Sequence, residues 1–262
     1  MGDPQARQER PARPERPARP ERPVRPAYYA AGPGRWRDWW TLLHPPFTAW
    51  HLAYVVLGAA IAPEVRLSRL LAAVGAFFLA VGVAAHALDE WQGRPLRTSI
   101  PSSLLIAATV IGLAGAVGLG VWGVTKVGWG LIPLMVIGPL LVIGYNAELF
   151  GGVIHTDLGF AVAWGGFPAL TGYVGQTGRL AIAPVIVAAA ATALSLGQRY
   201  LSTPARLLRR RTATVSGTIT LTSGEVIALD SARLLEPLER ALRSLSWGVV
   251  LLAAAVATAR LA

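Results

Sequence analysis

Hydrophobic residues dominate long stretches of the chain, and shorter polar segments separate these stretches. An apolar stretch of about 20 residues is long enough for a helix to cross the hydrocarbon core of a bilayer. We therefore predict an all-α fold, a polytopic helical membrane bundle of about seven spans. The predicted spans cover residues 47–62, 67–88, 101–123, 129–147, 158–174, 180–197 and 247–261.

The first 37 residues follow a different pattern, in which Arg-Pro pairs recur with proline about every third position. Proline lacks the N–H that helices and sheets need, and the segment has too few apolar residues to form a core. We predict a disordered, basic Pro/Arg-rich tail over residues 1–37, and no signal peptide. Trp36, Trp39 and Trp40 are interspersed with charged residues, which is typical of a short helix at the membrane interface.

A second polar segment separates the sixth and seventh predicted spans. Residues 214–222 alternate branched and small or polar side chains, Ser223-Gly224 is a turn pair and residues 225–229 return, which predicts a cytoplasmic β-hairpin. Leucines at helical spacing between 232 and 245 predict an amphipathic helix along the membrane surface. The predicted organisation is a tail (1–37), a membrane helical bundle (38–197), a basic cytoplasmic loop with hairpin and helix (198–245) and a final span (246–262).

The composition agrees with a membrane protein and limits its partners. Hydrophobic residues make up 53% of the chain and charged residues only 15%, whereas about 25% is usual for soluble domains. The net charge is +10, and the basic residues flank apolar spans, where anionic lipid is a nearer partner than nucleic acid. We expect membrane lipids and no nucleic acid as partners. The absence of cysteine excludes disulfides and cysteine-ligated metals.

The distribution of Lys and Arg predicts the orientation, because cytoplasmic loops carry the excess of these residues. With a cytoplasmic N-terminus, the cytoplasmic connections hold Arg94, Arg97, Arg199, Arg206, Arg209, Arg210, Arg211, Arg233, Arg240 and Arg243. The opposite connections hold Arg66, Arg69, Lys126 and Arg179. We therefore predict that residues 86–96, 145–157 and 199–211 open to the cytoplasm. The Arg-, Ala- and Pro-rich composition is compatible with a high-GC bacterium, which suggests a bacterial plasma membrane.

Candidate functional residues gather where the second predicted span ends. His86, Asp89, Glu90 and Arg94 lie within nine positions of each other, and ionisable groups at the membrane are costly and typical of functional sites. His86 precedes Asp89 by three residues, so both face the same way on a helix. A second polar group comprises Tyr145, Asn146, Glu148, His155 and Asp157.

Three stretches together resemble the UbiA superfamily of membrane prenyltransferases. His-Ala-Leu-Asp-Glu at 86–90, followed by Arg94-Pro95-Leu96, resembles the family's first aspartate motif. Residues 145–180 are similar to the middle of 1,4-dihydroxy-2-naphthoate prenyltransferases, and the loop after the sixth span lies where the family has its second aspartate motif. The resemblance covers residues 40–211. It implies transfer of an isoprenyl group from a diphosphate to a quinone-like or aromatic acceptor at a cytoplasm-facing cavity.

The resemblance also implies which residues carry the chemistry. His86, Asp89 and Glu90 are the candidate catalytic residues, and Asp89 and Glu90 would hold one Mg²⁺ ion against the diphosphate. Substrate-binding candidates are Arg94, Tyr145, Asn146, Glu148, Asp157, Arg199, Tyr200 and Arg206. The chain departs from the family in its second motif, since residues 198–214 contain arginines and no carboxylate. It also has fewer predicted spans than the nine that are usual there.

Each of these candidates has a structural alternative. Asp89 and Glu90 would pair with Arg94 and Arg97 at the membrane surface, Thr156 or Asp157 would cap the fifth span, and residues 209–211 would anchor the chain to anionic lipid. Two functions therefore remain open. One is a prenyltransferase-like enzyme that binds an isoprenyl diphosphate or polyprenyl lipid, and the other is a non-catalytic relative that binds a lipid or a protein.

Overall fold

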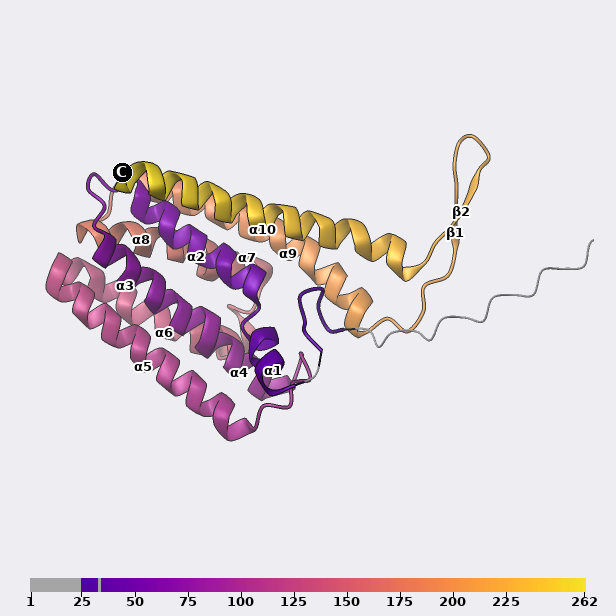
Figure 1. Cartoon of the computed structure of the whole chain (residues 1–262), viewed down its shortest axis with the longest axis horizontal. Coiled ribbons are helices and arrows are strands. Elements are labelled where there is room, and N and C mark those ends of the chain that lie inside the picture. Colours follow the sequence, from indigo (N-terminus) through magenta and orange to yellow (C-terminus); the bar gives the residue numbers. More distant parts are fainter. Residues whose placement is uncertain (1–24, 33) are drawn as a thin grey trace, which may run out of the picture.

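The computed structural model describes residues 25–32 and 34–262, which form a bundle of helices with a small hairpin beyond it (Figure 1). The N-terminal helices are α1 (Arg35–Leu42), α2 (Pro45–Ala60), α3 (Leu67–Phe77), η1 (Phe78–Ala85), α4 (His86–Gly93) and α5 (Ser102–Val127). The central elements are η2 (Trp129–Leu131), α6 (Ile132–Asn146), η3 (Phe150–Gly152), α7 (Asp157–Ala161), η4 (Val162–Gly166) and α8 (Phe167–Thr177). The last are α9 (Ile182–Arg210), β1 (Thr218–Thr220), β2 (Val226–Ala228) and α10 (Ser231–Leu261).

Five helical segments are long and apolar enough to cross a membrane, which indicates a membrane protein. They are Leu67–Gly93, Ser102–Val127, Trp129–Asn146, Ile182–Arg210 and Ser231–Leu261. The other two predicted spans are also helical, but α2 has 16 residues, and the segment from α7 to α8 is not among the five. Spanning by all seven segments therefore stays a prediction.

Helices α2 and α8 lie in the interior of the bundle and touch through their backbones. A Cβ on Gly58 would lie 1.9 Å from the carbonyl oxygen of Ala169, and a Cβ on Gly172 would lie 2.1 Å from that of Val55. Glycine permits this approach because it has no side chain. The core cluster around Trp50 and Tyr54 of α2 includes residues of α8, α9 and α10. Helices α2 and α8, which belong to the two shorter predicted spans, are thus enclosed by longer helices.

Two stretches of the bundle are π-helical, which the sequence analysis did not predict. They are η1, between α3 and α4, and η4, between α7 and α8. Gly112 of α5 packs against η1, where an added Cβ would lie 2.7 Å from the carbonyl oxygen of Leu79. π-helical turns are rare and often occur at functional sites, and both of these border the cavity described below.

The polar segment between α9 and α10 differs from its predicted boundaries. Helix α9 continues beyond residue 197 to Arg210, and residues 231–261 form one helix instead of a surface helix followed by a separate span. Asp230 caps this helix by accepting a hydrogen bond from the backbone N–H of Arg233 at 2.8 Å. An ion pair between Arg209 and Glu239 joins α9 to α10, and this contact holds the start of α10 against the bundle.

The predicted hairpin is confirmed, with its turn at the expected residues. Strands β1 and β2 are antiparallel, with Ile219 opposite Ile227. Gly224 has φ +84°, a conformation that glycine adopts readily. Figure 1 shows the hairpin extending away from the helices.

Candidate functional site

A polar cavity of about 550 Å³ lies where α4, α6 and α9 end and where α2 and α7 begin. This volume is in the usual range for small-molecule sites. Its polar wall includes His44, His51, His86, Asp89, Tyr145, Asn146, His155, Gln198, Arg199, Arg206 and Arg210. Residues from all three stretches that were predicted to open to one side therefore line one cavity.

Arginines of α9 supply the positive charge of the cavity. They differ in whether their guanidinium groups already form ion pairs or hydrogen bonds within the protein. Arg199 pairs with Asp157, with Nε 2.6 Å from Oδ1. Arg210 donates from Nε to the carbonyl oxygen of Pro26 at 3.0 Å. In the described part of the chain, the only hydrogen bond of Arg206 is to Thr203 Oγ1, at 3.3 Å. Arg211 also lines the cavity, but it is exposed where α9 ends. Among the half-buried arginines of the wall, Arg206 is thus the guanidinium most able to bind an anionic ligand.

Two carboxylates line the cavity, Asp89 and Glu239, and Glu239 is paired with Arg209. Among the described residues, Asp89 has no such partner. Its side chain is exposed. Within residues 25–32 and 34–262 it forms neither an ion pair nor a hydrogen bond, so the predicted alternative of pairing with Arg94 or Arg97 is not observed. Asp89 is therefore available to a ligand.

Glu90 has a different environment, although it is the next residue. Its carboxylate is fully buried and accepts hydrogen bonds from Leu96 N at 2.9 Å, Thr98 N at 2.8 Å and Thr98 Oγ1 at 2.9 Å. Successive helical residues point about 100° apart, so Glu90 faces the following loop and not the cavity. The predicted role of Glu90 as a magnesium ligand beside Asp89 does not fit this position, because its carboxylate oxygens already accept hydrogen bonds from the loop.

Arg94 also holds this loop and does not line the cavity. Its guanidinium donates to the carbonyl oxygen of Ile100 at 2.6 Å and to Ser102 Oγ at 2.9 Å. Helix α1 is fixed to the same loop, because the buried Asp38 accepts from the backbone N–H of Ser99 at 3.0 Å. Glu90 and Arg94 therefore hold the backbone of the loop that follows α4.

The 145–157 stretch contributes only part of its predicted set. Tyr145 and Asn146 line the cavity, and the ring of Tyr145 stacks on His155 with centroids 4.5 Å apart. Glu148 is exposed, and its carboxylate lies 4.0 Å from His155 Nδ1. Thr156 caps α7 by accepting from Gly159 N at 2.9 Å, which leaves Asp157 free to pair with Arg199.

Tyr200, which was predicted to bind substrate, lies outside the cavity. Its side chain is 63% exposed, and it is not among the lining residues. Arg199 precedes it on α9 and faces the cavity, so the helix turns Tyr200 toward another side.

All four histidines of the chain line the cavity. His44 stacks on His86 with ring centroids 4.2 Å apart. His44 and His51 were missed by the sequence analysis, because each lies beside apolar residues with no charged neighbour in the chain. Their spacing of seven residues, two helical turns, was the available signal that both face one side.

The segment before α1 contributes to the cavity wall through residues 26–29. The Tyr29 hydroxyl lies 2.9 Å from His44 Nδ1. Burial raises the pKa of Tyr28 to about 12 and also raises that of Tyr29. Burial lowers the pKa of His44 well below its usual value, and the nearby His86, Arg210 and Arg206 lower it further.

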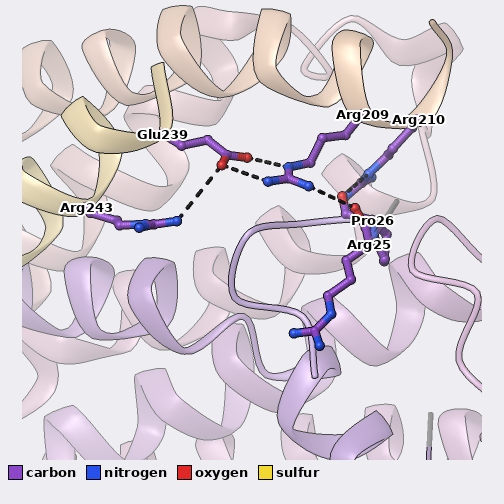
Figure 2. Close-up of polar contacts among 6 residues, drawn as sticks. All are labelled: Arg25, Pro26, Arg209, Arg210, Glu239 and Arg243. Atoms are coloured by element: carbon purple, nitrogen blue, oxygen red, sulfur yellow. Dashed lines mark hydrogen bonds and ion pairs between the residues drawn. The ribbon is translucent and has the colours of Figure 1, made fainter. Parts of the chain in front are cut away.

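Contacts with α9 and α10 hold this segment in place (Figure 2). Arg209 donates from Nη2 to Glu239 Oε2 at 2.7 Å and from Nη1 to the carbonyl oxygen of Arg25 at 3.4 Å. Arg243 lies 4.0 Å from the same carboxylate, and its guanidinium is 4.9 Å from the centroid of the Tyr28 ring. Most of the predicted tail, residues 1–24, lies outside the described residues, whereas residues 26–29 line the cavity.

A second, apolar cavity of about 100 Å³ lies between α3, α5, α6 and α8. Its wall includes Ala76, Gly120 and Phe167. Val81 and Trp164 line both cavities, and they belong to the π-helical segments η1 and η4. The two cavities are therefore neighbours across these two side chains.

The residues present do not form the predicted magnesium pair. Glu90 binds the loop, so Asp89 is the only member of that pair on the cavity wall. Among the described residues, no group of three or more His, Asp or Glu side chains is placed to hold a metal ion. The positive charge that the structure itself places in the cavity comes from arginine.

Comparisons with family models, curated proteins and solved structures give no match.

Proposed function

We propose that the chain binds a membrane lipid with a phosphate or diphosphate headgroup in the polar cavity. The observation that carries the proposal is the position of Arg206, a guanidinium on the cavity wall whose one hydrogen bond within the described chain is to a hydroxyl. Arginine matches the geometry of phosphate oxygens and keeps its charge. The resemblance to UbiA prenyltransferases favours an isoprenyl diphosphate or a polyprenyl phosphate as this lipid.

The apolar cavity of about 100 Å³ provides a place for the first segment of the lipid chain, although not for the whole chain. It lies among helices that are long and apolar enough to cross a membrane, and it adjoins the polar cavity at Val81 and Trp164. A lipid with its headgroup beside Arg206 would extend its chain past these two residues. The excess of arginine on this side of the chain supports a cytoplasmic cavity and N-terminus in a bacterial plasma membrane.

Titration of purified protein with geranylgeranyl phosphate in detergent tests the proposal. Arg206→Met should weaken binding about 10- to 100-fold, because a hydrogen bond to a charged group contributes about 1.5–3 kcal/mol. Arg240→Met is the matched control, since Arg240 is exposed on α10 and pairs with Glu236 away from the cavity wall. Equal affinity of wild type and Arg206→Met, or equal binding of geranylgeraniol, would contradict the proposal.

Prenyl transfer is the second candidate function, and the available carboxylate of Asp89 favours it. In such a reaction, a bond forms from a ring carbon of the aromatic acceptor to C1 of the prenyl chain, the C1–O bond breaks and diphosphate leaves. The attacked ring carbon then releases its proton to the Asp89 carboxylate, which restores the aromatic ring. Asp89→Asn should then retain binding of the diphosphate and lose turnover with an aromatic acceptor such as a dihydroxynaphthoate. Binding by the wild type without turnover would leave the non-catalytic lipid-binding function.

A further inference from the structure

The polar cavity contains hydrogen-bond acceptors that a phosphate group cannot use. In three histidines, Nδ1 lies against a backbone carbonyl oxygen, which can only accept a hydrogen bond. The pairs are His51 with Trp164 O at 2.8 Å, His86 with Gly82 O at 3.2 Å and His155 with Tyr145 O at 3.0 Å. Nδ1 therefore carries the proton in each ring, and in the neutral imidazole Nε2 remains as an acceptor.

These acceptor atoms share the cavity with the guanidinium groups of Arg206 and Arg210. Within the described chain, Nε2 of none of the three rings has a hydrogen-bond partner.

Gln198 adds a fourth acceptor. Its side chain is 2% exposed, it lines the polar cavity, and Oε1 has no hydrogen-bond partner in the described part of the chain. An unpartnered buried polar atom costs free energy, so a donor supplied by the ligand would relieve this cost. A phosphate at neutral pH offers oxygen atoms that accept hydrogen bonds, and it satisfies the arginines but not these acceptors.

We infer that the headgroup carries several hydroxyl groups next to its phosphate, as in a sugar or cyclic polyol linked to the lipid through a phosphodiester. This inference rests on the proposed function and specifies its ligand. The phosphate lies beside Arg206, and the hydroxyls donate to the imidazoles and to Gln198. The rings of Tyr145 and Phe160 in the wall suit the apolar face of such a ring. An ammonium headgroup also donates, but it would meet the positive charge of Arg206 and Arg210.

Two short-chain lipids of equal charge provide the test. Dioctanoyl phosphatidylinositol and dioctanoyl phosphatidylmethanol have the same chains and one negative phosphodiester each, and they differ in the hydroxyls. Isothermal titration of the full-length protein in detergent should show binding of the inositol lipid about tenfold or more tighter, which corresponds to two or three net hydrogen bonds. Dioctanoyl phosphatidylethanolamine, with an ammonium donor, is the third arm and should bind no better than the methanol lipid.

Variants separate this inference from the proposed function. Gln198→Met keeps the length of the side chain, and His155→Phe changes an exposed ring; each should reduce the ratio of inositol-lipid affinity to methanol-lipid affinity. Arg206→Met should weaken both lipids and keep their ratio, and Arg240→Met should change neither. Equal binding of inositol and methanol lipids, or a preference for ethanolamine, would overturn the inference of a hydroxyl-bearing headgroup. Such a result would leave the proposed binding of a phosphate lipid standing. Absence of binding by every phosphate lipid would overturn the proposed function as well.

Discussion

At the scale of single residues, Asp89 and Glu90 show how one helical step changes the role of a carboxylate. Asp89 lies on the cavity wall, whereas Glu90 is buried and accepts three hydrogen bonds from the loop at 96–98. In the sequence the two residues resemble a pair of metal ligands, because they are adjacent and both carry a carboxylate. Which of two neighbouring helical residues faces a loop depends on where that loop returns, and this is a tertiary property.

Substitution of Glu90 tests this division of roles. Glu90→Gln should lower the free energy of unfolding by about 2–3 kcal/mol, because it removes the charge that the buried N–H groups of Leu96 and Thr98 contact. Asp89→Asn should change it by less than about 0.5 kcal/mol. Thermal unfolding in detergent measures both, and equal stability of the two variants would contradict the assignment.

His44 predicts a dependence of stability on pH. The fold lowers the pKa of His44 through burial and through the facing groups of His86, Arg210, Arg206 and His51. Below about pH 6.5, the usual imidazole pKa, the unfolded chain therefore binds more protons than the folded one. The stability that neutral His44 contributes is complete above this pH and is lost as the pH falls toward the folded pKa.

The variant His44→Asn removes this titration while keeping the backbone. His44 has φ +46° before the first turn of α2, and asparagine tolerates this conformation. The unfolding midpoint of the wild type should fall more steeply than that of His44→Asn between pH 7.5 and pH 5. Parallel curves for the two proteins would show that His44 does not contribute.

At the scale of helices, the crossing of α2 and α8 predicts a stability effect at a single glycine. Gly172→Ala would place a Cβ 2.1 Å from the carbonyl oxygen of Val55, so the helices must separate, at a cost of about 1–3 kcal/mol. Gly118→Ala in α5 is the matched control, since an added Cβ there meets nothing within 4 Å and alanine favours the helix by up to about 1 kcal/mol. Unfolding midpoints that rise for both variants would rule out the close crossing.

Helix boundaries were harder to predict than helix positions. Each predicted span falls on a helical segment of the structure, because apolar stretches of this length signal helices. The extension of α9 to Arg210 and the continuity of α10 were missed, since contacts such as Arg209 with Glu239 join residues 30 positions apart. The π-helical segments have no sequence signature, and in the structure η1 packs against α5 and η4 against α9.

At the scale of the whole molecule, the sequence indicated which stretches would meet but not which side chains would share the cavity. Residues 86–96, 145–157 and 199–211 do contribute to one cavity, because the alternation of helices brings their ends together. His44, His51 and Gln198 were not predicted, because a single histidine beside an apolar stretch or a glutamine before an arginine-rich run does not stand out as a site residue. The three-dimensional arrangement places all three in one cavity with Arg206.

A phosphate lipid in the polar cavity should shield a cysteine introduced into the cavity wall, and the chain has no cysteine of its own that would also react. Thr203 is exposed and lines the cavity, whereas Ser223 lies at the turn of the hairpin. In Thr203→Cys, saturating geranylgeranyl phosphate should markedly slow alkylation by a water-soluble maleimide, and in Ser223→Cys it should leave the rate unchanged. An unchanged rate at position 203, under conditions where the lipid is bound, would place the lipid elsewhere and contradict the account.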